Sequence, residues 1–381
     1  MTPKKYIFAA ATLFSACTFG LHAQSVWFDT PTSLKGASIW YGGHPERYSS
    51  ANKPVRAGDS AYNPDQEWEG KSLPIGNGSI GANVMGSVEV ERYTLNEKTL
   101  WRGGPGTGRG ADKGTAKGAA HYWDVNVPAA RVLPEIRQAF ADGDFDKAAR
   151  LTRDNFHNEV PYEADGEPEF RFGSFTTLGE LLIETGHDAG SVKGYRRALS
   201  LDSAVATVSY QLDGVSFTRS SFISYPANAM VVRFAASERG KQNLTLRYNP
   251  SPVSEGRKTA MDNDGIVYEG RLDNNGMQYV VRLKAVVKGG TVSNANGELS
   301  VKGADEVVFV LTADTDYKPN YDPDFNDPKA YVGVDPVATT QQWMKQALKQ
   351  GYKRLLKAHL ADYGALYNRV KLDLGSGVAE S

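Results

Sequence analysis

Four side chains in one glycine-rich stretch have the chemical types that a carbohydrate site uses: Asn77, Asn96, Glu97 and Trp101. A carboxylate such as Glu97 could serve as one member of the acid–base pair that glycoside hydrolysis needs. Asn96 could hydrogen-bond sugar hydroxyls, and Trp101 could stack on the face of a sugar ring. The alternative is that Asn96 and Glu97 satisfy backbone groups in a buried turn while Trp101 fills a core or an interface. We favour this second interpretation, and expect the four residues to lie near a substrate or at a domain interface without a catalytic role.

The stretch that carries them runs from Leu73 to Pro105 and is suited to close backbone approach. It opens with Leu-Pro-Ile-Gly-Asn-Gly, and several further glycines follow. Glycine permits positive φ angles and tight packing, which a chain uses where a site or an interface must be shaped closely. The pair Asn77-Gly78 predicts a turn. The runs 80–84 and 88–95 predict two short strands after it.

Metal chemistry finds little support in the sequence. The six histidines show no His-x-His or His-x-x-x-His spacing and Cys17 is the single cysteine, so we do not expect a zinc site. The acidic run 322–326 resembles the start of a calcium loop. However, Asp327 and Gly333 occupy the positions that need glycine and a bidentate glutamate. A solvated acidic loop is the better interpretation, and calcium held in another geometry stays open.

Nucleotide and serine-nucleophile signatures are missing as well. The segment 102–118 holds seven glycines and four basic residues but no Gly-Lys-Ser/Thr triplet. We therefore interpret it as a surface loop rather than a phosphate cradle. No Gly-x-Ser-x-Gly occurs, so the sequence gives no support for a serine hydrolase. No cofactor is expected.

The charge balance bears on partners more than on fold. The chain carries 43 basic and 44 acidic side chains, a formal net charge of −1. A nucleic-acid partner would favour a strongly basic face, so none is expected. Hydrophobic residues make up 40% of the 381 residues, enough for a sizeable core. Past the amino terminus, no stretch is apolar enough to span a membrane.

The amino terminus reads as a targeting segment. Lys4 and Lys5 precede an apolar run, and Ala23 closes the segment in the manner of a secretory signal peptide over residues 1–23. This predicts export to the periplasm or the medium. Phe-Ser-Ala-Cys, ending at Cys17, also resembles a bacterial lipoprotein box, so a lipid anchor at Cys17 is the alternative. In neither case does the folded part contain a disulfide.

From Leu178 to Thr315 the sequence is a series of short β-branched and aromatic runs separated by turn signals. Asp213-Gly214 predicts a two-residue hairpin of the primed type. Asp-Gly or Asn-Gly pairs at 264, 275 and 296 supply turns of the same chemistry. So many strands without intervening helices predict a mainly β fold, a large antiparallel sandwich. The expected strands are 178–185, 195–201, 205–212, 215–222, 230–234, 244–248, 279–287 and 307–311.

Helical spacing occurs in two places. After Pro128, apolar residues from Val132 to Phe140 predict one helix and Asp144 caps a second, and we expect this inserted pair to pack on a sheet. Near the carboxyl end, 339–350 and 352–367 predict two further helices. Their apolar face from Leu355 to Leu366 looks suited to docking against a further domain. The expected division is therefore a sandwich over 24–335 and a helical linker over 336–381.

The opening motifs resemble those of a known family. Leu73-Pro-Ile-Gly-Asn-Gly78 followed by Leu95-Asn-Glu-Lys-Thr-Leu-Trp101 is similar to the amino-terminal domain of glycoside hydrolase family 95, the inverting α-L-fucosidases. Lys98 and Arg102 stand where Asp and Ser are commoner. Further matches are Leu178-Gly-Glu-Leu181, Tyr195 to Leu201, Arg219 with Phe222 and Ser224, Thr315-Asp-Tyr317, and His359 through Tyr363 to Val370.

This resemblance implies a β supersandwich, a helical linker and then an (α/α)6 barrel that carries the general acid and its partners. Because the barrel is expected to lie beyond this chain, no catalytic residue is placed on it. The implied partner is a fucosylated oligosaccharide or a plant or host glycan, bound through the barrel. Two alternatives remain: a stand-alone glycan-binding sandwich, and part of an α-L-galactosidase, since a sandwich does not choose the sugar.

Overall fold

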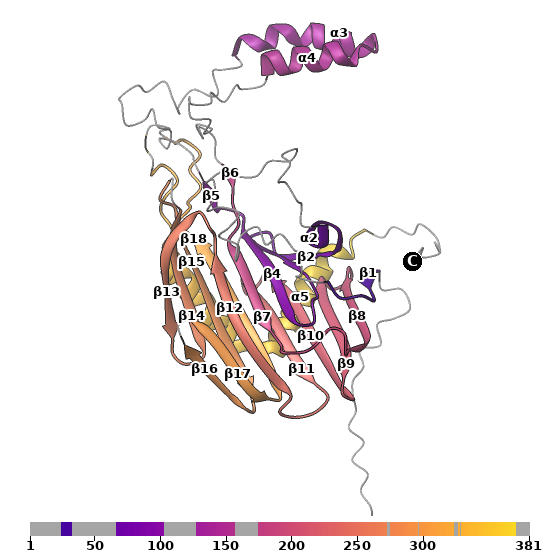
Figure 1. Cartoon of the computed structure of the whole chain (residues 1–381). Coiled ribbons are helices and arrows are strands. Elements are labelled where there is room, and N and C mark those ends of the chain that lie inside the picture. Colours follow the sequence, from indigo (N-terminus) through magenta and orange to yellow (C-terminus); the bar gives the residue numbers. More distant parts are fainter. Residues whose placement is uncertain are drawn as a thin grey trace, which may run out of the picture.

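Two antiparallel β-sheets packed face to face form the body of the protein in a computed structural model (Figure 1). The structure describes residues 24–32, 66–102, 127–156, 174–272, 275–295, 297–323, 327 and 329–370. The expected signal peptide with Cys17, and all of the glycine-rich segment after Arg102, lie outside these residues. The prediction of a mainly β, large antiparallel sandwich is confirmed.

The larger sheet has nine strands in the order β1-β8-β9-β10-β11-β18-β15-β14-β13, and all neighbours run antiparallel. Its strands are β1 Ser25–Phe28, β8 Lys193–Ser200, β9 Val205–Leu212, β10 Val215–Ser224, β11 Ala229–Ala236, β13 Ser254–Met261, β14 Gly265–Leu272, β15 Gln278–Lys288 and β18 Glu306–Thr315.

The smaller sheet has seven strands in the order β16-β17-β12-β7-β4-β3-β2, also antiparallel. They are β2 Leu73–Gly76, β3 Ile80–Val84, β4 Val90–Glu97, β7 Gly179–Glu184, β12 Gln242–Pro250, β16 Thr291–Ala295 and β17 Glu298–Ala304. A separate two-stranded ribbon pairs β5 Trp101–Arg102 with β6 Ser174–Phe175. A short helix, α2 Gln66–Lys71, precedes β2.

Strand β18 illustrates how the sequence builds the core. Phe309 and Leu311 point between the two sheets, whereas the alternate residues Val308 and Val310 point to the opposite face. Side chains alternate between the faces of a strand, so a strand buried on both faces reads as a continuous apolar run. The run Val-Val-Phe-Val-Leu in β18 therefore reflects a sheet that is covered on both sides.

The hairpin between β9 and β10 confirms the turn predicted from Asp213-Gly214. Leu212 pairs with Val215, and the two residues between them have φ angles of 50° and 80°. Positive φ at both central positions is the requirement of a type I′ turn, which asparagine, aspartate and glycine meet most easily.

Between Leu178 and Thr315, the expected strands omit β13, β14, β16 and β17. Of these, β13 and β16 are edge strands, and their side chains are mostly half-buried or exposed. Edge strands tolerate polar and charged residues, which weakens the alternation that a sequence search relies on. The turn signals were nevertheless informative, because Gly276 and Gly297 take φ angles of 70° and 73° in the turns next to these strands.

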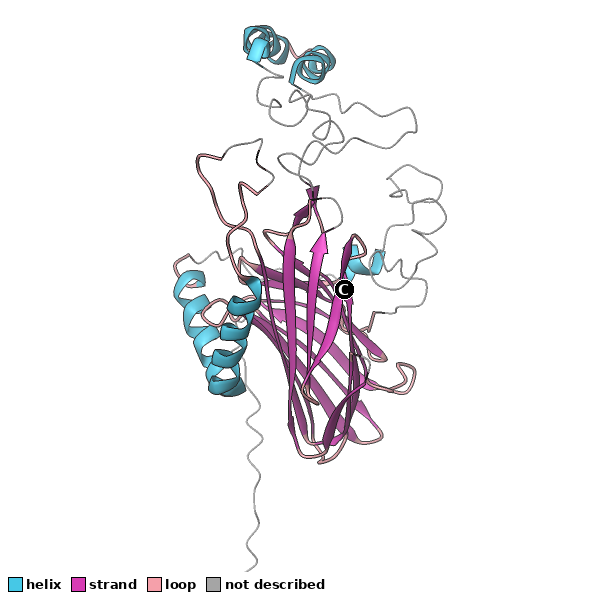
Figure 2. Cartoon of the chain, turned by 90° about the vertical axis from the view of Figure 1, so that its left-hand side faces the viewer, coloured by secondary structure: helices cyan, strands magenta, loops and turns pink. Residues whose placement is uncertain are grey.

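Helix α5, Pro336–Tyr367, confirms the two helices expected near the carboxyl end. Asp335 caps it by accepting hydrogen bonds from the backbone N–H groups of Val337 and Ala338. Gly351 interrupts it with a φ of 70°, and Figure 2 shows the two halves side by side against the larger sheet. The break falls at the residue that separates the two predicted helices.

The apolar face of α5 packs on the larger sheet. Met344, Ala347 and Leu355 are buried against a cluster that includes Phe222 and Val310. This corrects the expectation that the face from Leu355 onward serves a further domain, although Leu360 and Leu366 at its far end are exposed.

Polar contacts also anchor the second half of α5. His359 donates from Nε2 to the Ser203 carbonyl at 2.8 Å, and its ring lies 4.8 Å from that of Phe222. Tyr363 donates to the Leu201 carbonyl at 2.6 Å. The buried His359 is therefore a structural residue.

The inserted helices form a separate pair. After the 3-10 turn η2 Val127–Val132 come α3 Leu133–Ala141 and α4 Phe145–Phe156, which pack together through Ile136, Ala139 and Ala148. Asp144 caps α4 as predicted, since its carboxylate accepts from the Lys147 N–H at 3.0 Å. The expected packing on a sheet is wrong in this structure, because Figure 1 shows the pair apart from both sheets.

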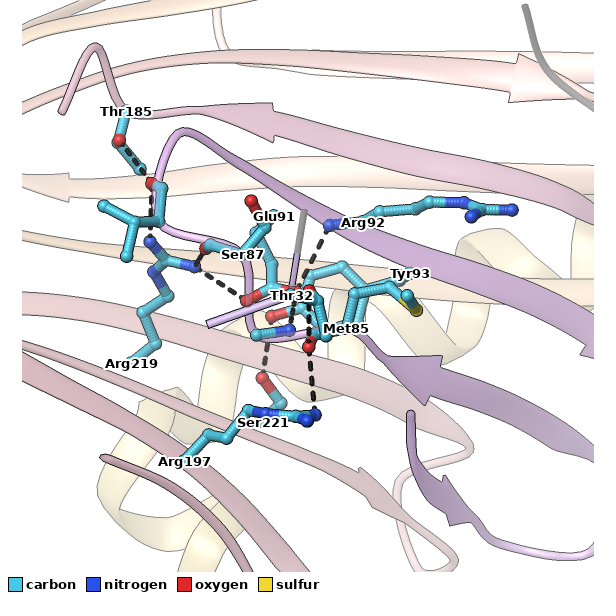
Figure 3. Close-up of polar contacts among 12 residues, drawn as sticks. Thr32, Met85, Ser87, Glu91, Arg92, Tyr93, Thr185, Arg197, Arg219 and Ser221 are labelled. Atoms are coloured by element: carbon cyan, nitrogen blue, oxygen red, sulfur yellow. Dashed lines mark hydrogen bonds and ion pairs between the residues drawn. The ribbon is translucent and has the colours of Figure 1, made fainter. Parts of the chain in front are cut away.

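A buried ion pair joins the two sheets. Arg219 on β10 donates to the Glu91 carboxylate on β4 at 2.7 Å, and both side chains are almost fully buried (Figure 3). Arg219 also donates to the Ser87 and Val88 carbonyls, at 2.5 and 3.1 Å. Glu91 accepts in addition from the Gly86 N–H at 2.7 Å. Burial raises the pKa of Glu91, and the Arg219 charge and the backbone donors oppose that rise.

Replacing Arg219 by Met should lower the free energy of unfolding by about 3–5 kcal/mol, because it leaves the Glu91 carboxylate buried without its cation. Arg247 provides the control, since it pairs with Glu184 and Glu298 on the surface, and Arg247→Met should cost about 1 kcal/mol at most. Urea unfolding measures both. Equal losses in the two variants would contradict the importance given to the buried pair.

Candidate functional site

Three of the four candidate residues gather at one end of the sandwich, which we call the loop end. Here the β2–β3 turn, the end of β4 and the end of β18 meet. The Lys98 N–H donates to the Ser79 carbonyl at 2.9 Å, and the hydroxyls of Thr99 and Thr315 lie 2.5 Å apart. The β5–β6 ribbon rises from this end (Figure 1).

Asn77 organises the β2–β3 turn. Its Oδ1 accepts from the backbone N–H groups of Ser79 and Ile80, at 2.9 and 2.8 Å. Its Nδ2 donates to the Ser224 carbonyl at the end of β10, at 3.2 Å. All of these partners are backbone groups of the protein, so Asn77 ties the two sheets together at the loop end and is a structural residue.

Asn96 points away from the other candidates. It pairs with Gly81 across β3 and β4, and a Cβ on Gly81 would lie 2.6 Å from the Asn96 Oδ1. Because neighbouring residues of a strand face opposite sides, Asn96 lies on the outer face of the smaller sheet and Glu97 on its inner face. The structure therefore does not bring these two residues together in one site.

Glu97 is buried in the turn that follows β4, with 3% of its surface exposed. Its Oε2 accepts from the Thr99 N–H at 2.7 Å and from the Thr99 hydroxyl at 2.5 Å. Burial raises the pKa of Glu97, the Thr99 hydrogen bonds oppose this rise, and the nearby Asp314 adds to it. These contacts match the interpretation that Glu97 satisfies hydrogen-bonding groups in a buried turn.

Trp101 is exposed and stands on the β5–β6 ribbon. The Trp101 indole N–H donates to the Lys98 carbonyl at 3.0 Å. The side-chain amide of Asn275 donates to the Trp101 carbonyl at 2.6 Å. The Trp101 ring meets that of Phe175 edge to face, with 5.9 Å between the centroids. Both rings are close to half exposed. Trp101 is thus held in one orientation while part of its ring faces solvent, as a stacking or docking residue requires.

Two further carboxylates at the loop end had no place among the candidate residues. Asp314 lies near the end of β18 and Asp316 follows directly after the strand, and burial raises the pKa of each. The Asp316 Oδ1 is buried and finds no hydrogen-bond partner in the described part of the chain. The signal for Asp316 was present in the Thr-Asp-Tyr motif, but burial of the end of β18 could not be seen without the fold.

The loop end supports binding or docking more readily than catalysis. Glycoside hydrolysis needs two carboxyl groups that face a common sugar. The Glu97 carboxylate instead accepts hydrogen bonds from Thr99. Within the described ranges, no group of three or more histidine, cysteine, aspartate or glutamate side chains could hold a metal ion. No helix in those ranges is long and apolar enough to cross a membrane.

A protein-family model matches the part of the chain that forms the sandwich and its loop end. The family model described as "Glycosyl hydrolase family 65, N-terminal domain" matches residues 60–320, which include most of the sandwich and the loop end. The chain belongs to this family. Its sandwich is therefore a glycoside hydrolase N-terminal domain, in agreement with the class of protein, though not the family number, that the motifs indicate.

Curated relatives carry fucosidase names. Alpha-L-fucosidase 2 of Arabidopsis thaliana is 29% identical over 84% of this chain and 37% of that protein. Probable alpha-fucosidase A of Aspergillus niger is 30% identical over 80% of this chain and 36% of that protein. The chain thus spans little more than a third of the length of either relative.

A solved structure titled putative kojibiose phosphorylase from human microbiome has a TM-score of 0.43 to this chain. It is 10% identical, and the superposition covers 80% of this chain and 37% of that one. This likeness is too weak to support an inference about fold or function.

Glu97→Gln tests the buried state of this carboxyl. A raised pKa in the folded state favours the protonated form, so its contribution to stability is full below the unfolded value near 4.5 and is lost as the pH rises. Glutamine does not ionise. From about pH 4 to about pH 7, the free energy of unfolding of the wild type should therefore fall relative to Glu97→Gln, as urea unfolding can measure. If the free energy of unfolding of the wild type rose relative to that of Glu97→Gln between these pH values, the raised pKa of Glu97 would be refuted.

Proposed function

We propose that this chain is the amino-terminal, non-catalytic part of an exported α-L-fucosidase of the family 95 type. The observation that carries the proposal is the match of over 80% of the chain to a protein named alpha-L-fucosidase. The Leu-Pro-Ile-Gly-Asn-Gly and Leu-Asn-Glu-Lys-Thr-Leu-Trp motifs support it. Export rests on the signal-like segment 1–23, and a lipid anchor at Cys17 is the alternative.

In this proposal the chemistry belongs to a domain outside this chain. An inverting glycosidase uses one carboxylic acid to protonate the glycosidic oxygen and a second carboxylate to activate water on the opposite face of the sugar. The two groups stand about 6.5–9.5 Å apart, leaving room for that water. The Thr99 contacts of Glu97 support a structural role instead, and no cofactor is needed. The sandwich would then shape and support the catalytic domain, with Trp101 and Phe175 at or near the seam.

The proposal predicts the outcome of an activity assay. The 381-residue chain should leave an aryl α-L-fucoside intact, whereas a protein extended to the length of the relatives should hydrolyse it with inversion, as NMR of the released sugar can follow. Turnover by the 381-residue chain would overturn the placement of catalysis outside it. Faster turnover of an aryl α-L-galactoside by the extended protein would favour the α-L-galactosidase alternative.

A second candidate, a glycan-binding module, rests on the partly exposed rings of Trp101 and Phe175. We expect no binding of fucosylated oligosaccharides by the 381-residue chain in isothermal titration calorimetry. Trp27 offers a matched control, since it is 45% exposed against 44% for Trp101 and lies under the Arg196 guanidinium on another edge of the protein. Binding that is lost in Trp101→Ala and kept in Trp27→Ala would replace the first proposal by the second.

A further inference from the structure

Helix α5 carries an uncompensated group of cations on its free side. From Pro336 to Ala361 the sequence has five basic residues and no acidic one. All five side chains are exposed. We call them the basic strip: Lys345, Lys349, Lys353, Arg354 and Lys357.

The helix geometry places the strip on one side. Met344, Ala347 and Leu355 hold α5 on the larger sheet, so exposed residues between them face away from it. Lys345 and Lys349 are four residues apart, a spacing that puts side chains on the same helix face about 6 Å apart along the axis. Lys353 and Lys357 repeat the spacing after the break at Gly351, and Figure 2 shows the two halves of α5 side by side.

No counter-ion balances these charges in the described structure. None of its salt bridges involves a residue of the basic strip, whereas other surface cations such as Arg247 and Lys284 have carboxylate partners. Glu306 on β18 forms its ion pair with Arg233 rather than with the basic strip. The Arg233 guanidinium also lies over the Tyr352 ring of α5.

The arrangement is unfavourable for the helix itself. Like charges four residues apart repel each other. Cations near the start of a helical segment, such as Lys353 and Arg354 just after Gly351, also oppose the helix dipole. A bound anion would relieve both effects. It would neutralise the lysine and arginine charges, and it would lie near the positive end of the helix dipole of the second half of α5.

We propose that the basic strip binds an anionic polysaccharide through its carboxylate or sulfate groups. A polysaccharide with repeated negative charges suits cations that recur every four residues on each of the two neighbouring halves of α5. The proposal rests on the proposed function, which makes the chain part of an enzyme that acts on glycans. Between Lys345 and Lys357 no large hydrophobic side chain is strongly exposed. A membrane-inserting helix interleaves apolar and basic residues on its contact face, so that pattern does not favour a lipid surface.

Dextran sulfate and polygalacturonate serve as probes, with neutral dextran as the blank. The 381-residue chain should bind both polyanions at low salt and lose affinity steeply as salt rises. The double variant Lys349→Glu/Lys353→Glu should bind at least about tenfold more weakly, because the lost charge contacts carry most of such affinity. Lys193→Glu/Lys302→Glu makes the same change in net charge at two exposed lysines elsewhere, and should bind like the wild type.

Absence of binding to both polyanions, or equal losses in the two double variants, would overturn the proposal. Tighter binding to anionic lipid vesicles or to duplex DNA than to the polysaccharides would do so too. Urea unfolding of each variant checks that the exposed substitutions leave the fold intact. Since binding is measured without hydrolysis, a negative result here is distinct from failure of the fucosidase proposal.

Discussion

The ion pair between Glu91 and Arg219 fixes the contact between the two sheets beside the β3–β4 bend. It connects a strand of the smaller sheet to a strand of the larger one in a place that water does not reach. Charges buried in this way persist only when they are paired and hydrogen-bonded. The backbone from Gly86 to Val88 supplies hydrogen bonds to both charged groups, so the bend between β3 and β4 must keep one shape. The buried Arg219 Nε is an exception, with no partner in the described part of the chain.

That bend shows how closely the chain is fitted around the pair. Gly86 has a φ of 75°, and a Cβ there would lie 2.5 Å from Arg197 and 2.9 Å from the Tyr195 hydroxyl. Arg197 donates to the Met85 carbonyl at 3.2 Å, next to the same bend (Figure 3). Tyr195, Arg197 and Arg219, all on the larger sheet, thus bind the backbone of the bend between β3 and β4 of the smaller sheet.

Helix α5 depends on the same sheet from the other side. Because Val308 and Val310 are covered by the helix while Phe309 and Leu311 fill the sandwich, the larger sheet is buried on both faces. The helix is then fixed in orientation, with His359 and Tyr363 bonded to backbone carbonyls near the β8–β9 turn. Because the helix cannot rotate on the sheet, its lysine and arginine side chains always face solvent on the same side. A chain with a net charge of −1 can therefore still present a strongly basic strip, which the overall composition conceals.

Local patterns in the sequence determined the fold class, most strands, the hairpin at Asp213-Gly214 and the break at Gly351. Turn chemistry and the alternation of apolar residues act over a few residues, so they can be read without the fold. Two motifs at the loop end also indicated the class of protein, a glycoside hydrolase N-terminal domain, but not the family number of the matching model. Only the tertiary structure decided what those motif residues do. Asn96 and Glu97 are neighbours in the chain, yet the pleat of β4 sends one outward and the other into a turn closed by Thr99. Burial of Asp316 and the cover of α5 over the sheet likewise depend on contacts between distant segments, which no local pattern encodes.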